Sequence, residues 1–211
     1  MTIPPDTINS SFEGRIFLQD AGNVAVASLG QIVEGYAVVF GNEHQINLRS
    51  LKLIERRDFL DFVLKVRQHI ELHFGSTIMF EHGACSPGTR VSCGVDRMHV
   101  HVVPFDGSSL IESIEKKYRC LAITATVEQM LEKMSDWQND RPYFWIDEGS
   151  HVFLFSYGEK RESQVVRRAI AEQAGMGSRW NWREFPTQDA AERLTKKLLT
   201  HVAISRQWQT A

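Results

Sequence analysis

The residues best suited to chemistry lie in one short stretch, Asp-Arg-Met-His-Val-His-Val-Val-Pro at positions 96–104. Polar and apolar residues alternate there, as they do along a strand with one buried face. Alternate residues of a strand share a face, so Arg97, His99 and His101 are expected to form one row. Neighbours in that row would be about 6–7 Å apart, because a strand rises about 3.3 Å per residue. Two imidazoles and a guanidinium at this spacing could hold one anion from a rigid floor.

Two other interpretations of this stretch stay open. A His-X-His strand also suits a metal site, in which His82, Cys85 or Cys93 would supply further ligands. Arg97 argues against that site, because its fixed cation would lie beside the metal. The two histidines could also be purely structural, although the residues between them are typical of a core. We favour the anion site, and we expect no metal and no cofactor.

The composition of the chain limits its function and location. With 211 residues, 43% of them hydrophobic, it is long enough for one large domain or one domain with an extension. A net charge of −2 argues against a general nucleic-acid or membrane-surface binder. Three cysteines without CxxC spacing fit a reducing compartment. Neither a signal peptide nor an apolar run of about 18–20 residues is evident, so we expect a cytoplasmic protein without nucleic-acid or membrane partners.

Short strands and one long helix are expected to position the polar row. Apolar residues recur at three- and four-residue steps through residues 51–74, which predicts a helix with one buried face. The runs at 77–80 and 93–103 flank a loop that contains proline and glycine, so they are expected to pair as an antiparallel hairpin. Three further strands are expected upstream, at residues 15–18, 24–29 and 35–40.

The runs Met-Phe-Glu-His-Gly at 79–83 and Cys-Gly-Val-Asp-Arg-Met-His-Val-His-Val-Val-Pro at 93–104 resemble a known signature, His-φ-His-φ-His-φ-φ with φ apolar. This signature is that of the histidine triad (HIT) superfamily, which the chain therefore resembles. Gly-Tyr-Ala-Val-Val-Phe at 35–40 and Glu-His-Gln-Ile at 43–46 resemble the family's upstream strand and turn. The resemblance covers roughly residues 12–106. It implies an α+β fold, an antiparallel sheet of about five strands with the long helix packed on it.

The resemblance implies nucleotidyl chemistry on a phosphate or phosphoramidate ester of a nucleotide. The middle histidine of the signature, here His99, would attack the α-phosphorus to give a covalent nucleotidyl-histidine, while His101 would hold phosphate oxygens. The expected substrate is a small nucleotide or dinucleotide, and a homodimer is expected because family members are commonly homodimers. The candidate substrate-binding residues within the motif runs are His44, Tyr36, Glu81, Cys93 and Gly94.

Two residues depart from the family pattern. Arg97 replaces the first triad histidine, and Tyr36 replaces the histidine that helps to position the triad in the family. Both are expected to fall on one supporting layer. Arginine can clamp a phosphate bidentately, but it cannot shuttle protons near neutral pH. The alternative to an enzyme acting through Arg97, His99 and His101 is therefore a nucleotide-binding or sensing protein with weak or no turnover. A metal-dependent hydrolase is a third, less favoured hypothesis.

The remainder of the chain is expected to form an α/β extension packed on the core. The stretches at 163–171 and 180–183 look like the tail of some longer bacterial HIT-like proteins. Gln164, Arg167 and Arg168 at a helix start could offer donors to an anion. We favour the plainer interpretation, in which both arginines are solvated and the tryptophans pack the extension onto the core. The expected organisation is a flexible arm at 1–12, a HIT-like domain at 13–120 and the extension at 121–211.

Overall fold

The structure is a computed structural model that describes residues 12–20, 22–41, 45–84, 97–134, 141–158 and 162–208, with side chains up to residue 200. Its strands are β1 (Ile16–Gln19), β2 (Val24–Ala27), β3 (Ala37–Phe40), β4 (Thr77–Gly83), β5 (His99–Pro104), β6 (Arg119–Thr124), β7 (Tyr143–Asp147) and β8 (Val152–Ser156). They form one antiparallel sheet in the order β1-β2-β3-β5-β4-β7-β8-β6. The sheet therefore has more strands than the five or so expected, because β7, β8 and β6 continue it beyond β4.

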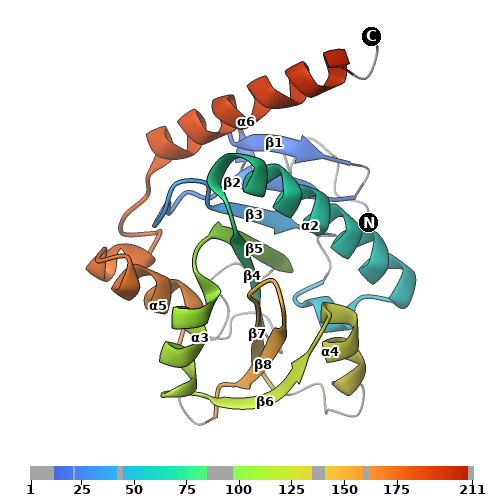
Figure 1. The fold of residues 1–211 in the computed structure, drawn as a ribbon, viewed down its shortest axis with the longest axis vertical. Helices are drawn as coiled ribbons and strands as arrows, with labels where there is room; N and C mark the ends of the chain where they lie inside the picture. The colour runs from blue at the N-terminus through green and yellow to red at the C-terminus, as the bar shows by residue number, and fades with distance from the viewer. Residues whose placement is uncertain are drawn as a thin grey trace.

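Helices cover both faces of this sheet (Figure 1). The helices are α2 (Leu53–Phe74), α3 (Gly107–Glu115), α4 (Val127–Lys133), α5 (Val165–Gln173) and α6 (Gln188–Trp208), with 3₁₀ turns η1 (Leu48–Ser50) and η2 (Gly177–Trp180). Side chains of α2, α4 and α6 belong to the hydrophobic cluster on one face, and those of α3 and α5 to the cluster on the other. Among the described residues, no helix combines the length and apolarity needed to cross a membrane.

Strand β5 lies between β3 and β4 and carries the two histidines of the polar row, while Arg97 lies two residues before the strand. On β3, Phe40 pairs with His99 and Val38 with His101, while on β4 Phe80 pairs with His101. The apolar residues that alternate with the histidines belong to the cluster under α2. The predicted hairpin of the two strands and the predicted alternation of the polar row are therefore both confirmed.

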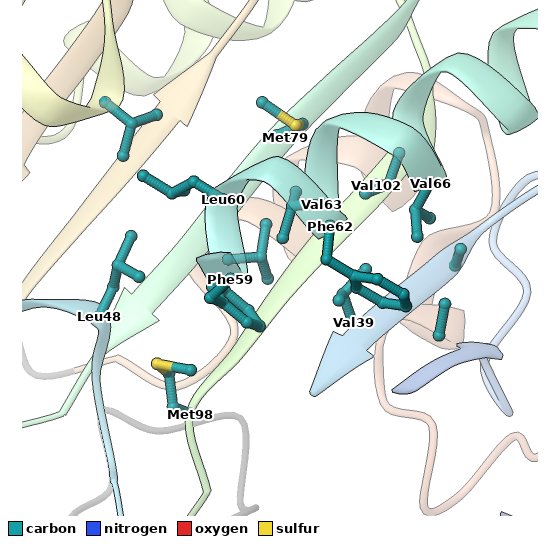
Figure 2. Close-up of a cluster of buried hydrophobic side chains, with 14 of the residues drawn as sticks. Val39, Leu48, Phe59, Leu60, Phe62, Val63, Val66, Met79, Met98 and Val102 are labelled. Carbon is teal, nitrogen blue, oxygen red and sulfur yellow. The ribbon is translucent and has the colours of Figure 1, made fainter. Parts of the chain in front are cut away.

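Helix α2 packs on the face of the sheet that is opposite the histidines. Figure 2 shows Phe59, Phe62, Val63 and Val66 of this helix lying over apolar side chains of the sheet. The helix begins two residues later than predicted, and Gly75 follows its last residue with a positive φ of 80°. Glycine adopts a positive φ without the steric cost of a Cβ, which makes it a common residue after a helix.

Glu81, which we expected near the substrate, lies instead on the α2 face of β4. Its Oε1 accepts a hydrogen bond from the Leu48 N–H at 2.6 Å, and its Oε2 accepts from the Tyr143 hydroxyl at 3.0 Å and Trp145 Nε1–H at 2.9 Å. Strand alternation is the reason, since the residues on either side of it face the histidines. Burial raises the pKa of Glu81 to about 7, although the three hydrogen bonds favour its charged form.

This buried carboxyl group predicts a pH dependence of stability. The pKa of Glu81 in the folded chain, about 7, lies above the ordinary value of 4.5. Between these two values the folded state binds more protons than the unfolded state, so the contribution of Glu81 to the free energy of unfolding should fall as the pH rises. Urea unfolding at a series of pH values measures this contribution.

The variant Glu81→Gln carries no titrating group at this position. Its free energy of unfolding should therefore fall less steeply than that of the wild type between the ordinary pKa of 4.5 and about 7. Glu132→Gln, at an exposed position of α4, is the matched control and should keep the wild-type slope. Equal slopes for the wild type and Glu81→Gln would contradict the prediction.

Candidate functional site

A cavity of about 420 Å³ opens on the histidine face of the sheet, a size typical of small-molecule sites. Side chains from β2 and β3 make part of its wall apolar, and three arginines and two histidines supply polar groups. Among the described residues, no carboxylate belongs to the lining. The lining residues are Phe12, Arg15, Val26, Ser28, Leu29, Val38, Phe40, Arg97, His99, His101, Arg167 and Trp182. The cavity is therefore suited to an anion that carries an apolar or aromatic group.

His99 is oriented by a hydrogen bond to the backbone of its own strand. Its Nδ1 lies 2.7 Å from the carbonyl oxygen of Arg97, and a carbonyl can only accept. The ring proton is therefore on Nδ1, which leaves the lone pair on Nε2. Burial lowers the pKa of His99; the hydrogen bond to Arg97 opposes this shift, and the charges of Arg167 and Arg97 add to it. The imidazole is thus neutral near neutral pH, as a nucleophile requires.

His101 is held by a stacked ring and by a buried hydroxyl. Its ring is stacked on Phe80, with centroids 4.4 Å apart, and its Nδ1 lies 3.0 Å from the Tyr36 hydroxyl. Burial is the largest cause that holds the pKa of His101 well below its ordinary value. Tyr36 is fully buried and does not belong to the described lining of the cavity. The structure therefore places Tyr36 against His101 and outside the described lining of the cavity, in which we had expected it.

Arg97 lies at the other end of the row. Its Nε and Nη2 donate to the carbonyl oxygen of Gly41 at 3.2 and 2.8 Å, and its guanidinium lies 5.5 Å from the centre of the Phe40 ring. It lines the cavity together with His99. The structure thus brings the three predicted catalytic residues into one site. Tyr36 contacts the opposite end of the row, so the expectation that it shares one supporting layer with Arg97 is wrong.

A third histidine, His82 of β4, joins this cluster. Its ring centroid lies 6.0 Å from that of His101, and its Nε2 accepts a hydrogen bond from the Val166 N–H at 3.3 Å. Burial lowers the pKa of His82 to about 3, so the ring is neutral. We had considered His82 only as a metal ligand. Its place on β4, two residues after Phe80, was the sequence signal that it faces the same side as His101.

Arg167 is a site residue that the sequence prediction wrongly placed in solvent. We expected it to be solvated, but it is 1% exposed and lines the cavity. Its Nε donates to the Trp180 carbonyl and its Nη2 to the Gly30 carbonyl, both at 3.0 Å. Its guanidinium lies 4.8 Å from the centre of the Tyr36 ring. Arg168 agrees with the expectation, since it is exposed and lies over the Trp180 ring.

Several predicted residues fall outside the described part of the chain. They are His44, Cys93 and Gly94, proposed around the substrate, and Cys85, considered as a metal ligand. Within the described ranges, no group of three or more histidine, cysteine, aspartate or glutamate residues is placed to hold a metal ion. The hypothesis of a metal-dependent hydrolase therefore gains no support from the described residues.

Comparison with known proteins gives only distant structural likenesses. No family model matches the chain, and no curated protein matches it either. Among solved structures, it is similar to a Hit-like protein involved in cell-cycle regulation from Bartonella henselae, with an unknown ligand. The identity is 19% and the TM-score 0.39, over 49% of this chain and 78% of the other. A likeness this distant supports no argument, so membership of the HIT superfamily stays a prediction from the sequence motif.

The contact between Tyr36 and His101 predicts the effect of removing one hydroxyl. A phenol is a better hydrogen donor than a neutral imidazole, so we expect the Tyr36 hydroxyl to donate to Nδ1 and the ring proton of His101 to lie on Nε2. In Tyr36→Phe this tautomer loses its support, and the free energy of unfolding should fall by about 1 kcal/mol. Imidazole nitrogen chemical shifts report the tautomer, and denaturant unfolding reports the stability.

Tyr118→Phe is the matched control for this variant. It also removes a hydroxyl that donates one hydrogen bond, to Glu162 at 3.0 Å, but at a different place in the fold. We expect Tyr118→Phe to leave the nitrogen shifts of His101 unchanged. The same His101 tautomer in the wild type and in Tyr36→Phe would show that the hydroxyl does not set the proton position.

Proposed function

We propose that the protein is a nucleotide hydrolase or nucleotidyltransferase that acts at an α-phosphate through a covalent intermediate on His99. The observation that carries this proposal is the hydrogen bond from His99 Nδ1–H to the Arg97 carbonyl, because it leaves an unprotonated Nε2 in a cationic cavity. The resemblance of the surrounding residues to the HIT signature supports the same chemistry. The substrate class is a small nucleotide or dinucleotide.

In the proposed first step, the Nε2 lone pair of His99 attacks the α-phosphorus. A nitrogen–phosphorus bond forms, and the bond from phosphorus to the leaving group breaks with its electron pair going to the leaving group, which takes a proton from solvent. In the second step, water or another acceptor hydroxyl attacks the phosphorus and loses its proton to solvent. The nitrogen–phosphorus bond then breaks, and its electron pair returns to His99.

Hydrogen-bond donors of the cavity would act in both steps. Negative charge accumulates on the phosphoryl oxygens as the nucleophile approaches, and preorganised donors at that place stabilise the transition state. Arg97 and His101 flank His99 in the row and are the donors that we propose for these oxygens. The apolar side chains of the cavity, among them Val38 and Phe40, would pack against the nucleoside.

A second candidate function is nucleotide binding without turnover. Arg97 favours it, because a guanidinium binds phosphate well but exchanges no proton near neutral pH. Both candidates predict a nucleotide in this cavity. They differ in whether the bond from His99 to phosphorus ever forms, so the covalent intermediate decides between them.

Acid-labile labelling tests the intermediate directly. The protein is incubated with a set of adenylyl esters and phosphoramidates labelled at the α-phosphate, denatured in base, and analysed for label bound to the chain. We expect label that is stable in base and released in acid, as a phosphohistidine-type bond is. Because His99 is already neutral, the labelling rate should stay nearly constant as the pH rises above the ordinary histidine pKa of 6.5.

Two variants make this experiment specific. His99→Ala removes the nucleophile, so the rate of labelling should fall by roughly 10⁴-fold or more and the label on the chain to background. His151→Ala removes an exposed histidine outside the cavity and should label like the wild type. Nucleotide binding without label in the wild type would reject the enzyme and select the binding protein. Equal labelling of the wild type and His99→Ala would reject His99 as the nucleophile.

A further inference from the structure

Arg167 is a buried cation whose hydrogen bonds within the fold go to neutral groups. Both of its hydrogen bonds, from Nε and Nη2, end on backbone carbonyl oxygens. Among the described residues, no carboxylate forms an ion pair with it and Nη1 has no hydrogen-bond partner. A charged side chain removed from water is costly unless an opposite charge or strong hydrogen bonds compensate it. The missing negative charge is the first indication of a ligand.

The position of Arg167 gives the second indication. It lines the same cavity as His99 and His101, although it comes from α5 in the later part of the chain. Its guanidinium lies over Tyr36, the residue whose hydroxyl contacts His101. Arg97 contacts Phe40, which pairs with His99. Arg97 therefore lies against a ring that contacts His99, and Arg167 lies against a ring that contacts His101.

The surrounding backbone fixes the Arg167 side chain in this place. A Cβ atom at Gly30 would collide with Arg167 Nη2 and with Trp182, so only glycine leaves room for the guanidinium there. Thr187 ties the same loop to the later segment, since its N–H and its hydroxyl both donate to the Leu29 carbonyl at 2.6 Å. A guanidinium held by such contacts is preorganised and needs little reordering to bind a ligand.

We propose that Arg167 binds a phosphate group of the substrate, so that α5 and the segment that follows it complete the site. This inference rests on the proposed nucleotidyl function, because it assumes a phosphate ester in the cavity. Arginine suits the role, since its planar guanidinium matches the oxygens of a phosphate. Arg167 also favours the neutral forms of His99, His101 and His82, because its charge adds to the effect of burial in lowering their pKa values.

Binding of inorganic pyrophosphate tests Arg167 without any need for turnover. Isothermal titration of the full chain with pyrophosphate gives a dissociation constant for the anion site. In Arg167→Gln we expect this constant to rise about 10- to 100-fold, as for the loss of a hydrogen bond to a charged group. Arg168→Gln removes the exposed neighbouring cation and should bind like the wild type.

Two further variants separate ligand binding from a structural role. Like Arg167→Gln, Arg167→Lys cannot make both carbonyl hydrogen bonds, but it keeps the positive charge. Because of that charge, it should bind pyrophosphate more tightly than Arg167→Gln. Gly30→Ala keeps Arg167 but displaces its guanidinium, so it should weaken pyrophosphate binding even if Arg167→Gln does not fold. Thermal unfolding without ligand shows which variants are folded at the titration temperature.

Three results would overturn the inference: no pyrophosphate binding by the wild type, unchanged binding by folded Arg167→Gln, or equally weak binding by the Lys and Gln variants. Failure of the proposed function is separate. Wild-type pyrophosphate binding that depends on Arg167, without any label on His99, would reject the nucleotidyl intermediate but keep the phosphate contact. Label on His99 together with pyrophosphate binding that is unchanged in Arg167→Gln would keep the nucleotidyl intermediate but reject the phosphate contact of Arg167.

Discussion

The site depends on the position of β5 at the middle of the sheet. Because β3 and β4 pair with it on either side, its backbone hydrogen bonds fix where each side chain points. One set of alternate residues packs under α2, and the other presents His99 and His101 to the cavity. A shift of register by one residue would exchange these two sets and bury the histidines in the apolar core. The core under α2 therefore also holds the orientation of the imidazoles.

A second property of the site is that its histidines are neutral among cations. Burial lowers the pKa values of His82, His99 and His101, and nearby arginines lower them further. A neutral imidazole can attack phosphorus, whereas a protonated one cannot. The positive charge of the cavity is carried by guanidinium groups, which stay charged at any pH near neutral. In the proposed mechanism the nucleophile is therefore a neutral histidine, while the positive charge that attracts the phosphate comes from arginines.

Much of the first half of the fold could be predicted from the sequence. The alternation at 97–103 predicted which residues share a face, and the helical spacing predicted the buried face of α2, because both patterns are local. The strand β6 (Arg119–Thr124) was missed, since it is an edge strand with partly exposed residues and little alternation. The size of the sheet was underestimated for a different reason. Strand β7 pairs with β4 across a long sequence separation, and no local pattern reveals such a pairing.

The site was harder to predict than the fold. Glu81 and His82 are adjacent, and the pairing of β4 decides that His82 faces His101 and Glu81 the α2 core. Arg167 looked like a solvated residue because charge usually means exposure. The sequence did hold a signal, since Arg167 lies among the buried apolar positions of α5. That signal becomes decisive only when Gly30, far away in the chain, is known to lie against it.

The cavity joins Phe12 near the start of the chain to Trp182 near its end. During synthesis, the N-terminal part of a chain leaves the ribosome first and folds first. The histidine row can therefore form before the segment that carries Arg167 and Trp182 has been made, but a complete cavity cannot. The complete cavity is therefore expected only after Arg167 and Trp182 have been synthesised, whereas β1 to β5 can pair before that point.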